Sequence, residues 1–186
     1  MTAEIALDTR ISEPALDAGE AELLLFSLDR SRAQFAWKAA GLDAAALQRT
    51  VGSSSMTLAG LLKHLSWVEE RYAIDVTGRP PAEPWRSVDW DATPGWDWSS
   101  AADDTPEQLY ALWRETVARC RDAWSVVLAG DALDQPAKFT ADDAGRSPNL
   151  RRILVDLTDE YARHVGHADL LREGIDGLVG EDPPQA

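Results

Sequence analysis

The sequence contains little cysteine, and this scarcity limits the classes of protein to which the chain can belong. Its 186 residues include a single cysteine, Cys120, so no disulfide can form within the chain. A disulfide-stapled secreted domain is therefore not expected, and a reducing compartment suits the chain better. No stretch approaches the roughly 18 consecutive apolar residues of a membrane-spanning helix. The first ten residues, MTAEIALDTR, lack the apolar stretch of a signal peptide. We expect a soluble, cytoplasmic protein with no membrane partner.

Positive charge is also scarce. The chain has 18 Lys and Arg residues against 32 Asp and Glu residues, which gives a formal net charge of −14 at pH 7. Such a field repels the phosphate backbone of nucleic acids and the surface of an anionic membrane. A nucleic-acid partner is therefore not expected, and the acidity mainly favours solubility without identifying a partner.

Strand patterns are missing as well, whereas four stretches repeat apolar residues with helical spacing. They run from about 18 to 40, 57 to 76, 105 to 130 and 149 to 173. Gly41, Gly78 and Gly130 stop the first three, Gly174 and Gly177 follow the fourth, and Thr105 is a candidate N-cap of the third. We predict an all-α, four-helix bundle that forms one domain over 1–186, with an ordered core at about 18–178 and a flexible tail at 179–186. Two long connections leave open whether the topology is up-down-up-down or includes a crossover.

The connection at 79–104, here called the tryptophan segment, is rich in Pro, Asp and Trp. Four of the eight tryptophans of the chain fall in it, namely Trp85, Trp90, Trp96 and Trp98. Long connections without secondary structure are uncommon unless they are functional or disordered, and disordered segments are poor in aromatic residues. We therefore expect the tryptophan segment to pack on the bundle as a lid.

The last helical stretch carries polar residues where core residues are expected. Its inward-facing seam follows a spacing of 3 and 4 residues and consists of Leu150, Ile153, Leu157, Glu160, His164, His167 and Leu171. The ends of this seam are apolar, but its middle is Glu-His-His. Because an unpaired buried carboxylate or imidazole is costly, something must compensate for these groups.

His64 on the second helical stretch supplies the third element of a metal site. It shares a helical strip with Leu61 and Val68, so it should face the bundle interior. Glu160 and His164 are four residues apart, so their side chains lie one above the other. We predict that His64, Glu160 and His164 bind one divalent metal, with a fourth position open for water or substrate. Zinc is the expected ion, and nickel, iron and manganese remain alternatives.

Each of these residues also has a simpler interpretation. His64 alone could be a hydrogen-bonded core histidine, and Glu160 and His164 could form an ordinary ion pair. We assign His167 and Asp156 as candidate catalytic acid–base residues. His167 could instead be a fourth ligand, orient one or contact the substrate, and Asp156 could orient a ligand or be a solvated acid. Cys120 lies on a buried seam, where a free cysteine usually behaves as a small hydrophobic residue rather than as a nucleophile.

Three segments resemble the DinB-like superfamily (DinB/YfiT-like four-helix bundles). The segment LRRILVDLTDEYARHVGHADLLREGIDG at 150–177 is similar to the last helix of an actinobacterial branch. TLAGLLKHLSWVEERY at 57–72 resembles its second helix, and FSLDRSRAQFAWKAAGLD at 26–43 its first. The resemblance covers about 20–178. It implies a divalent metal bound at the positions of His64, Glu160 and His164, and the Glu-x-x-x-His version is similar to mycothiol-dependent maleylpyruvate isomerase relatives. Branch members often carry His where this chain has Asp156, which weakens any role assigned to that position.

The first functional hypothesis is a metal-dependent enzyme that uses a low-molecular-weight thiol such as mycothiol, as a transferase or an isomerase. The metal would lower the pKa of the thiol and so supply thiolate. The alternative is a non-catalytic stress protein that binds a metal or a small ligand. A third hypothesis is an interaction protein whose metal only stabilises the bundle. A homodimer is a candidate assembly, since symmetric dimers are the commonest oligomers.

Overall fold

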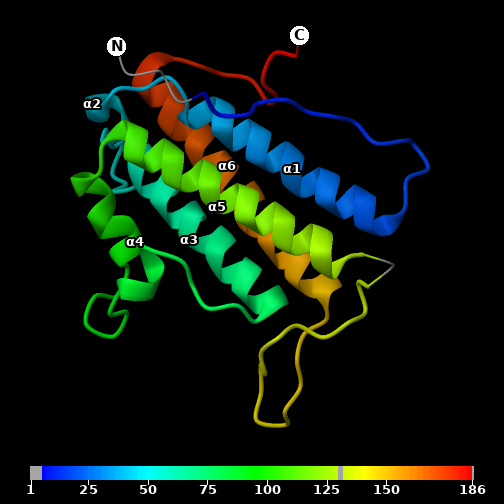
Figure 1. Ribbon diagram of the computed structural model, residues 1–186. Helices are drawn as coiled ribbons and strands as arrows, with labels where there is room; N and C mark the ends of the chain where they lie inside the picture. Colours follow the sequence, from blue (N-terminus) through cyan, green and yellow to red (C-terminus); the bar gives the residue numbers. More distant parts are fainter. Residues whose placement is uncertain (1–5, 130–131, 186) are drawn as a thin grey trace.

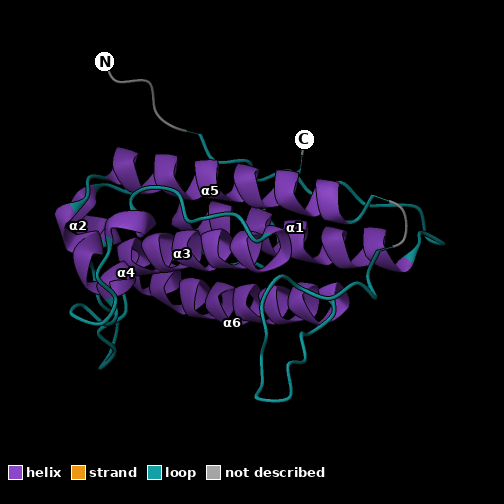
Figure 2. Ribbon diagram, turned by 60° about the horizontal axis from the view of Figure 1, so that its bottom comes forward, coloured by secondary structure: helices purple, strands orange, loops and turns teal. Residues whose placement is uncertain are grey.

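The computed structural model describes residues 6–129 and 132–185. Its four long helices form a bundle, shown in Figure 1: α1 (Glu20–Ala39), α3 (Leu58–Thr77), α5 (Pro106–Val127) and α6 (Leu150–Asp176). The shorter helical pieces are α2 (Ala44–Leu47), η1 (Trp85–Ser87), α4 (Trp96–Ser99) and η2 (Ser100–Asp103). Apart from one isolated bridge between Pro136 and Asn149, the described residues are helix, turn or loop, as Figure 2 shows. The predicted all-α bundle is confirmed.

Short polar side chains start three of the long helices. Thr57 accepts a hydrogen bond from the Gly60 backbone N–H, and Asn149 accepts one from Arg152. Thr105 and Gln108 form a reciprocal capping box at the start of α5. Each cap satisfies a backbone donor that has no partner inside the helix. The helix starts expected from the sequence at about 57, 105 and 149 therefore coincide with capped helix starts in the structure.

The ends of the helices agree less closely with the sequence. Gly78 ends α3 in the left-handed conformation, as predicted. The prediction that the last helix ends at about 173 is wrong, because α6 runs through Gly174 and ends at Asp176, with Gly177 as its cap. Gly174 leaves room for Val51, because a Cβ at this position would lie 2.7 Å from Cγ2 of Val51. The predicted stop at Gly130 lies outside the described residues, and α5 ends at Val127.

The bundle has a crossover topology. The tryptophan segment carries the chain from the end of α3 back to the level where α3 began, so that α3 and α5 run in the same direction (Figure 1). Lys63, near the start of α3, accordingly contacts Asp104, just before α5, at 2.5 Å. α1 and α6 also run parallel, and Arg151 at the start of α6 pairs with Glu20 at the start of α1 at 2.7 Å. α1 packs on α6, while α3 packs on both α5 and α6.

The core contains an ion pair among its aromatic residues. Arg32 of α1 and Glu69 of α3 are 2% and 0% exposed and form two parallel hydrogen bonds of 2.7 and 2.6 Å. Nearby, the Trp113 indole donates to the Tyr161 hydroxyl at 3.1 Å. Cys120 is fully buried, and this burial raises the pKa of its thiol well above the ordinary value. Its burial agrees with the structural role predicted for it.

The segment predicted as a flexible tail runs back over α1. The Asp182 carboxylate accepts hydrogen bonds from Arg30 at 3.1 Å and from Gln34 at 2.8 Å. The Gln185 side chain accepts from the Ile11 backbone N–H at 2.9 Å.

None of the helices in the described part of the chain combines the length and the apolar composition needed to cross a membrane.

We predict that replacing Glu69 by alanine strongly destabilises the bundle. The buried Arg32 guanidinium would lose its buried partner and keep only the half-exposed Asp29 carboxylate at 2.8 Å, which costs about 3 kcal/mol of unfolding free energy. Glu115→Ala, at an exposed position on α5, is the control and should change that free energy by less than about 0.5 kcal/mol. Urea unfolding measures both, and equal small losses in the two variants would contradict the prediction.

Candidate metal centre

The structure brings the three predicted ligands together. Glu160 and His164 stand one turn apart on α6, and His64 faces them from α3. Oε1 of Glu160 lies 3.4 Å from Nε2 of His64 and 3.3 Å from Nε2 of His164. One ligand atom from each of the three residues lies within 4.8 Å of the other two. Residues almost a hundred positions apart in the sequence thus form one compact donor cluster.

The spacing of these donors fits a divalent cation. A tetrahedral zinc ion with bonds of about 2.0–2.1 Å separates its ligand atoms by roughly 3.3 Å. The carboxylate oxygen lies at about this distance from both imidazole nitrogens. A two-histidine, one-carboxylate set also suits iron, nickel or manganese. The residues present therefore fit a divalent cation and leave at least one coordination position for another ligand.

The protonation states of the cluster suit a cation as well. Burial disfavours the charged form of Glu160, but its hydrogen bond with His64 and the proximity of His164 outweigh this and lower its pKa. Burial, with a smaller contribution from the neighbouring His64, lowers the pKa of His164 to about 4. Near neutral pH the cluster thus offers a carboxylate and a neutral His164 imidazole, the forms in which these groups bind metal.

Asp97 is the residue of this site that the sequence analysis missed. It lies on α4, within the tryptophan segment, and is 5% exposed. Its Oδ2 atom lies 2.7 Å from Nδ1 of His64, on the opposite side of the imidazole ring from Glu160. Carboxylates commonly orient metal-binding histidines in this way. An acid between two tryptophans, Trp96 and Trp98, was the available signal, but its partner lies 33 residues away.

A groove of about 430 Å³ opens beside the cluster. His64 and Glu160 form part of its wall, and the other lining residues are Trp67, Val68, Arg71, Tyr72, Asp75, Phe139, Ile153 and Asp156. Burial, together with the nearby carboxylates of Asp156 and Glu160, raises the pKa of Tyr72 to about 12, so its hydroxyl keeps its proton. A small molecule in this groove would therefore contact two of the three candidate ligands, His64 and Glu160.

Asp156 lies in the groove but outside the ligand cluster. Its side chain is 44% exposed and pairs with Arg152 at 3.2 Å. It therefore sits where it can meet a molecule in the groove, not where it can orient one of the three ligands.

His167 lies behind His164. The two Nδ1 atoms are 3.2 Å apart, whereas His164 turns its Nε2 atom towards Glu160. His167 also lines a separate, largely apolar pocket of about 640 Å³ with residues that include Val51, Met56 and Leu171. The structure therefore places His167 in contact with a candidate ligand but not in the groove that His64 and Glu160 share.

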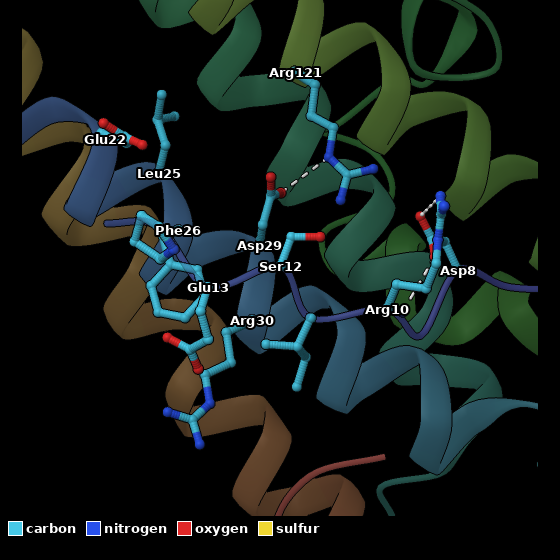
Figure 3. Close-up of a pocket in the computed structure, with 12 residues that line it drawn as sticks. Asp8, Arg10, Ser12, Glu13, Glu22, Leu25, Phe26, Asp29, Arg30 and Arg121 are labelled. Atoms are coloured by element: carbon cyan, nitrogen blue, oxygen red, sulfur yellow. Dashed lines mark hydrogen bonds and ion pairs between the residues drawn. The ribbon is translucent and has the colours of Figure 1, made fainter. Parts of the chain in front are cut away.

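Another hollow, of about 590 Å³, lies far from these histidines in the chain and contains none of them. It forms where residues 8–14 pass over α1, as Figure 3 shows. Its charged side chains pair locally, Arg10 with Asp8 at 3.0 Å and Arg121 with Asp29 at 2.9 Å. With most of its charges already paired, this hollow shows no chemistry comparable to that of the three-residue cluster.

Comparison with known families gives one match. A family model described as mycothiol-S-transferase covers residues 23–177. This range includes the four long helices except the first residues of α1, and all five candidate site residues. No curated protein matches the chain significantly.

We predict that the metal-free protein loses stability as the pH falls from about 6.5 towards 4. In the unfolded chain His164 takes up a proton at its ordinary pKa, whereas the folded state resists protonation until about pH 4. Because the unfolded state then binds more protons, the unfolding free energy falls with pH, by on the order of 2 kcal/mol. Urea unfolding with a chelator present measures this, and His164→Asn should flatten the curve in this window. Parallel curves for the two proteins would contradict the assignment.

Proposed function

The chain belongs to the mycothiol-S-transferase family, and from that premise we propose that it is a metal-dependent enzyme that transfers a low-molecular-weight thiol, such as mycothiol, to an electrophilic acceptor. The observation that carries the proposal is the compact set of His64, Glu160 and His164 donors at the wall of a groove. Three protein ligands with an open position are typical of catalytic metal sites, whereas structural sites are closed by four.

A divalent cation held by these three residues would lower the pKa of a bound thiol and make its thiolate available near neutral pH. His64 is held by Asp97 with its Nε2 atom towards Glu160, and His164 turns its own Nε2 atom to the same carboxylate. The chain thus supplies a set of donors that are already oriented before any ligand arrives. Such preorganisation avoids reorganisation at the moment of reaction.

In this proposal, side chains of the groove transfer a proton and donate hydrogen bonds to the thiol and the acceptor. In the proposed reaction the sulfur loses its proton and forms a bond to the electrophilic carbon, while the leaving group departs with the electron pair of the bond that breaks. Asp156 lines the groove and is exposed enough to receive that proton. Tyr72 keeps its proton and can donate a hydrogen bond to a polar group of either substrate. His167, at 3.2 Å from His164, acts on the orientation of that imidazole.

We predict that elemental analysis finds about one divalent ion per chain, as expected of a mononuclear site. The protein is purified without a nickel column, because such a column would load the site with nickel. The His64→Ala/His164→Ala double variant should lose the ion, and Asp156→Ala, which lies outside the cluster, should keep it. A wild-type protein that takes up neither Zn²⁺, Fe²⁺ nor Ni²⁺ would contradict the proposed centre.

We also predict thiol-dependent conjugation of an electrophilic acceptor by the metal-loaded protein. Asp156→Asn should lower kcat by about 10²-fold if this carboxylate accepts the proton, with the metal content unchanged. Steady-state kinetics with a low-molecular-weight thiol measures the effect, and the double histidine variant provides the background rate. Bound metal with no thiol-dependent turnover would favour the alternative, a non-catalytic protein that binds a metal or a small ligand.

A further inference from the structure

One face of α3 holds the tryptophan segment by a series of side-chain contacts. Lys63 lies over the Trp96 ring at 4.2 Å and pairs with Asp104. One turn further, Trp67 stacks on Trp90 with ring centroids 4.4 Å apart. The segment is therefore fixed to the same helix that carries the candidate ligand His64, by polar and aromatic contacts on either side of it.

The first part of the segment is fixed further along the same helix. Glu70 accepts two hydrogen bonds from Arg79, at 2.8 and 2.9 Å, and one from the Ala82 backbone N–H at 2.6 Å. Its carboxylate is completely buried, so these charge-assisted bonds are shielded from solvent. Both halves of the tryptophan segment are therefore anchored to α3.

His64 lies within this series and is held by two neighbouring residues of the segment. Asp97 contacts its Nδ1 atom at 2.7 Å, and the Trp98 ring stacks on the imidazole with centroids 4.3 Å apart and planes 21° apart. A hydrogen on Nδ1 that is donated to Asp97 leaves the lone pair on Nε2, the atom that faces Glu160. The hydrogen bond thus selects the tautomer, and the stacking fixes the plane of the ring.

We propose that Asp97 and Trp98 are positioning residues for His64, and that through them cation binding and closure of the tryptophan segment are thermodynamically coupled. The inference rests on the proposed function, because it requires a cation at the three-residue cluster. Coupling is reciprocal: a segment held against α3 raises cation affinity, and a bound cation holds the segment more tightly. The held segment also contacts one wall of the groove, since Trp67 belongs both to the groove lining and to the aromatic contacts.

A substitution at Gly60 tests the coupling without replacing a polar residue. A Cβ at this position would lie 3.0 Å from Cε3 of Trp98 and 3.3 Å from Oγ1 of Thr57. Gly60→Ala must therefore displace Trp98 by a few tenths of an ångström. Gly166 on α6 is the matched control, because a Cβ there meets nothing within 4 Å. Both changes replace a helical glycine by alanine, in the first turn of α3 and in the interior of α6, and alanine favours the helix over glycine.

The first experiment is zinc affinity, measured by competition with a chelator. We expect Asp97→Ala to weaken zinc binding by about 10–100-fold. Asp97→Asn keeps an oxygen acceptor for the Nδ1 hydrogen and should lose less. Gly60→Ala should weaken binding several-fold, whereas Gly166→Ala should match the wild type. A merely structural role of Asp97 would change the thermal midpoint of the metal-free protein without changing zinc affinity.

The second measurement is hydrogen exchange of the backbone amides in residues 85–104. Zinc should slow their exchange in the wild type and have no such effect in Asp97→Ala. Wild-type zinc affinity in both Asp97→Ala and Gly60→Ala would overturn the coupling and leave the metal centre intact. A wild type that binds no zinc would overturn the centre and the coupling together. If Asp97→Ala does not fold, the comparison of Gly60→Ala with Gly166→Ala decides the question.

Discussion

The structure depends on one constraint: three polar side chains that face a bundle interior must compensate for one another. Glu160 satisfies this by lying between two imidazoles, at 3.4 Å from His64 and 3.3 Å from His164. The arrangement leaves the carboxylate ionised and His164 neutral. A carboxylate that converges with the neutral His164 imidazole offers negative charge and a free lone pair at one point. A divalent cation would satisfy both, and no further protein group is needed for it.

The crossover topology supplies the rest of the site. Because α3 and α5 run in the same direction, the chain must travel the full length of the bundle between them, and the tryptophan segment covers this distance. A tight turn between antiparallel helices would have left no residues to reach His64 from outside. The connection therefore both joins two helices and brings Asp97 to the ring nitrogen that the bundle itself leaves without a partner.

The sequence predicted what depends on periodicity and on local hydrogen bonds. Helix positions, the caps at Thr105 and Gly78, and the inward seam through Glu160 and His164 follow from residues close together in the chain. The prediction at the end of the last helix failed because Gly174 makes room for Val51, a contact between distant segments. Asp97 was missed for the same reason, since its partner is 33 residues away. His167 was recognised as polar on the seam, but its position behind His164 depends on side-chain rotation, which spacing does not determine.

The same bundle contains a buried charge pair that differs chemically from the candidate centre. Arg32 and Glu69 are joined by two parallel hydrogen bonds, so the charge of the carboxylate is neutralised by the guanidinium, which also reaches Asp29 at 2.8 Å. Glu160 instead faces imidazoles that are neutral or share its hydrogen bonds, and only its second oxygen reaches a cation, Arg163, at 3.3 Å. Burying an uncompensated carboxylate on an apolar seam is costly, and an arginine in place of His64 would relieve that cost as it does for Glu69. Histidine at position 64 leaves the carboxylate available, which is the arrangement a metal-binding site requires and a purely structural ion pair does not.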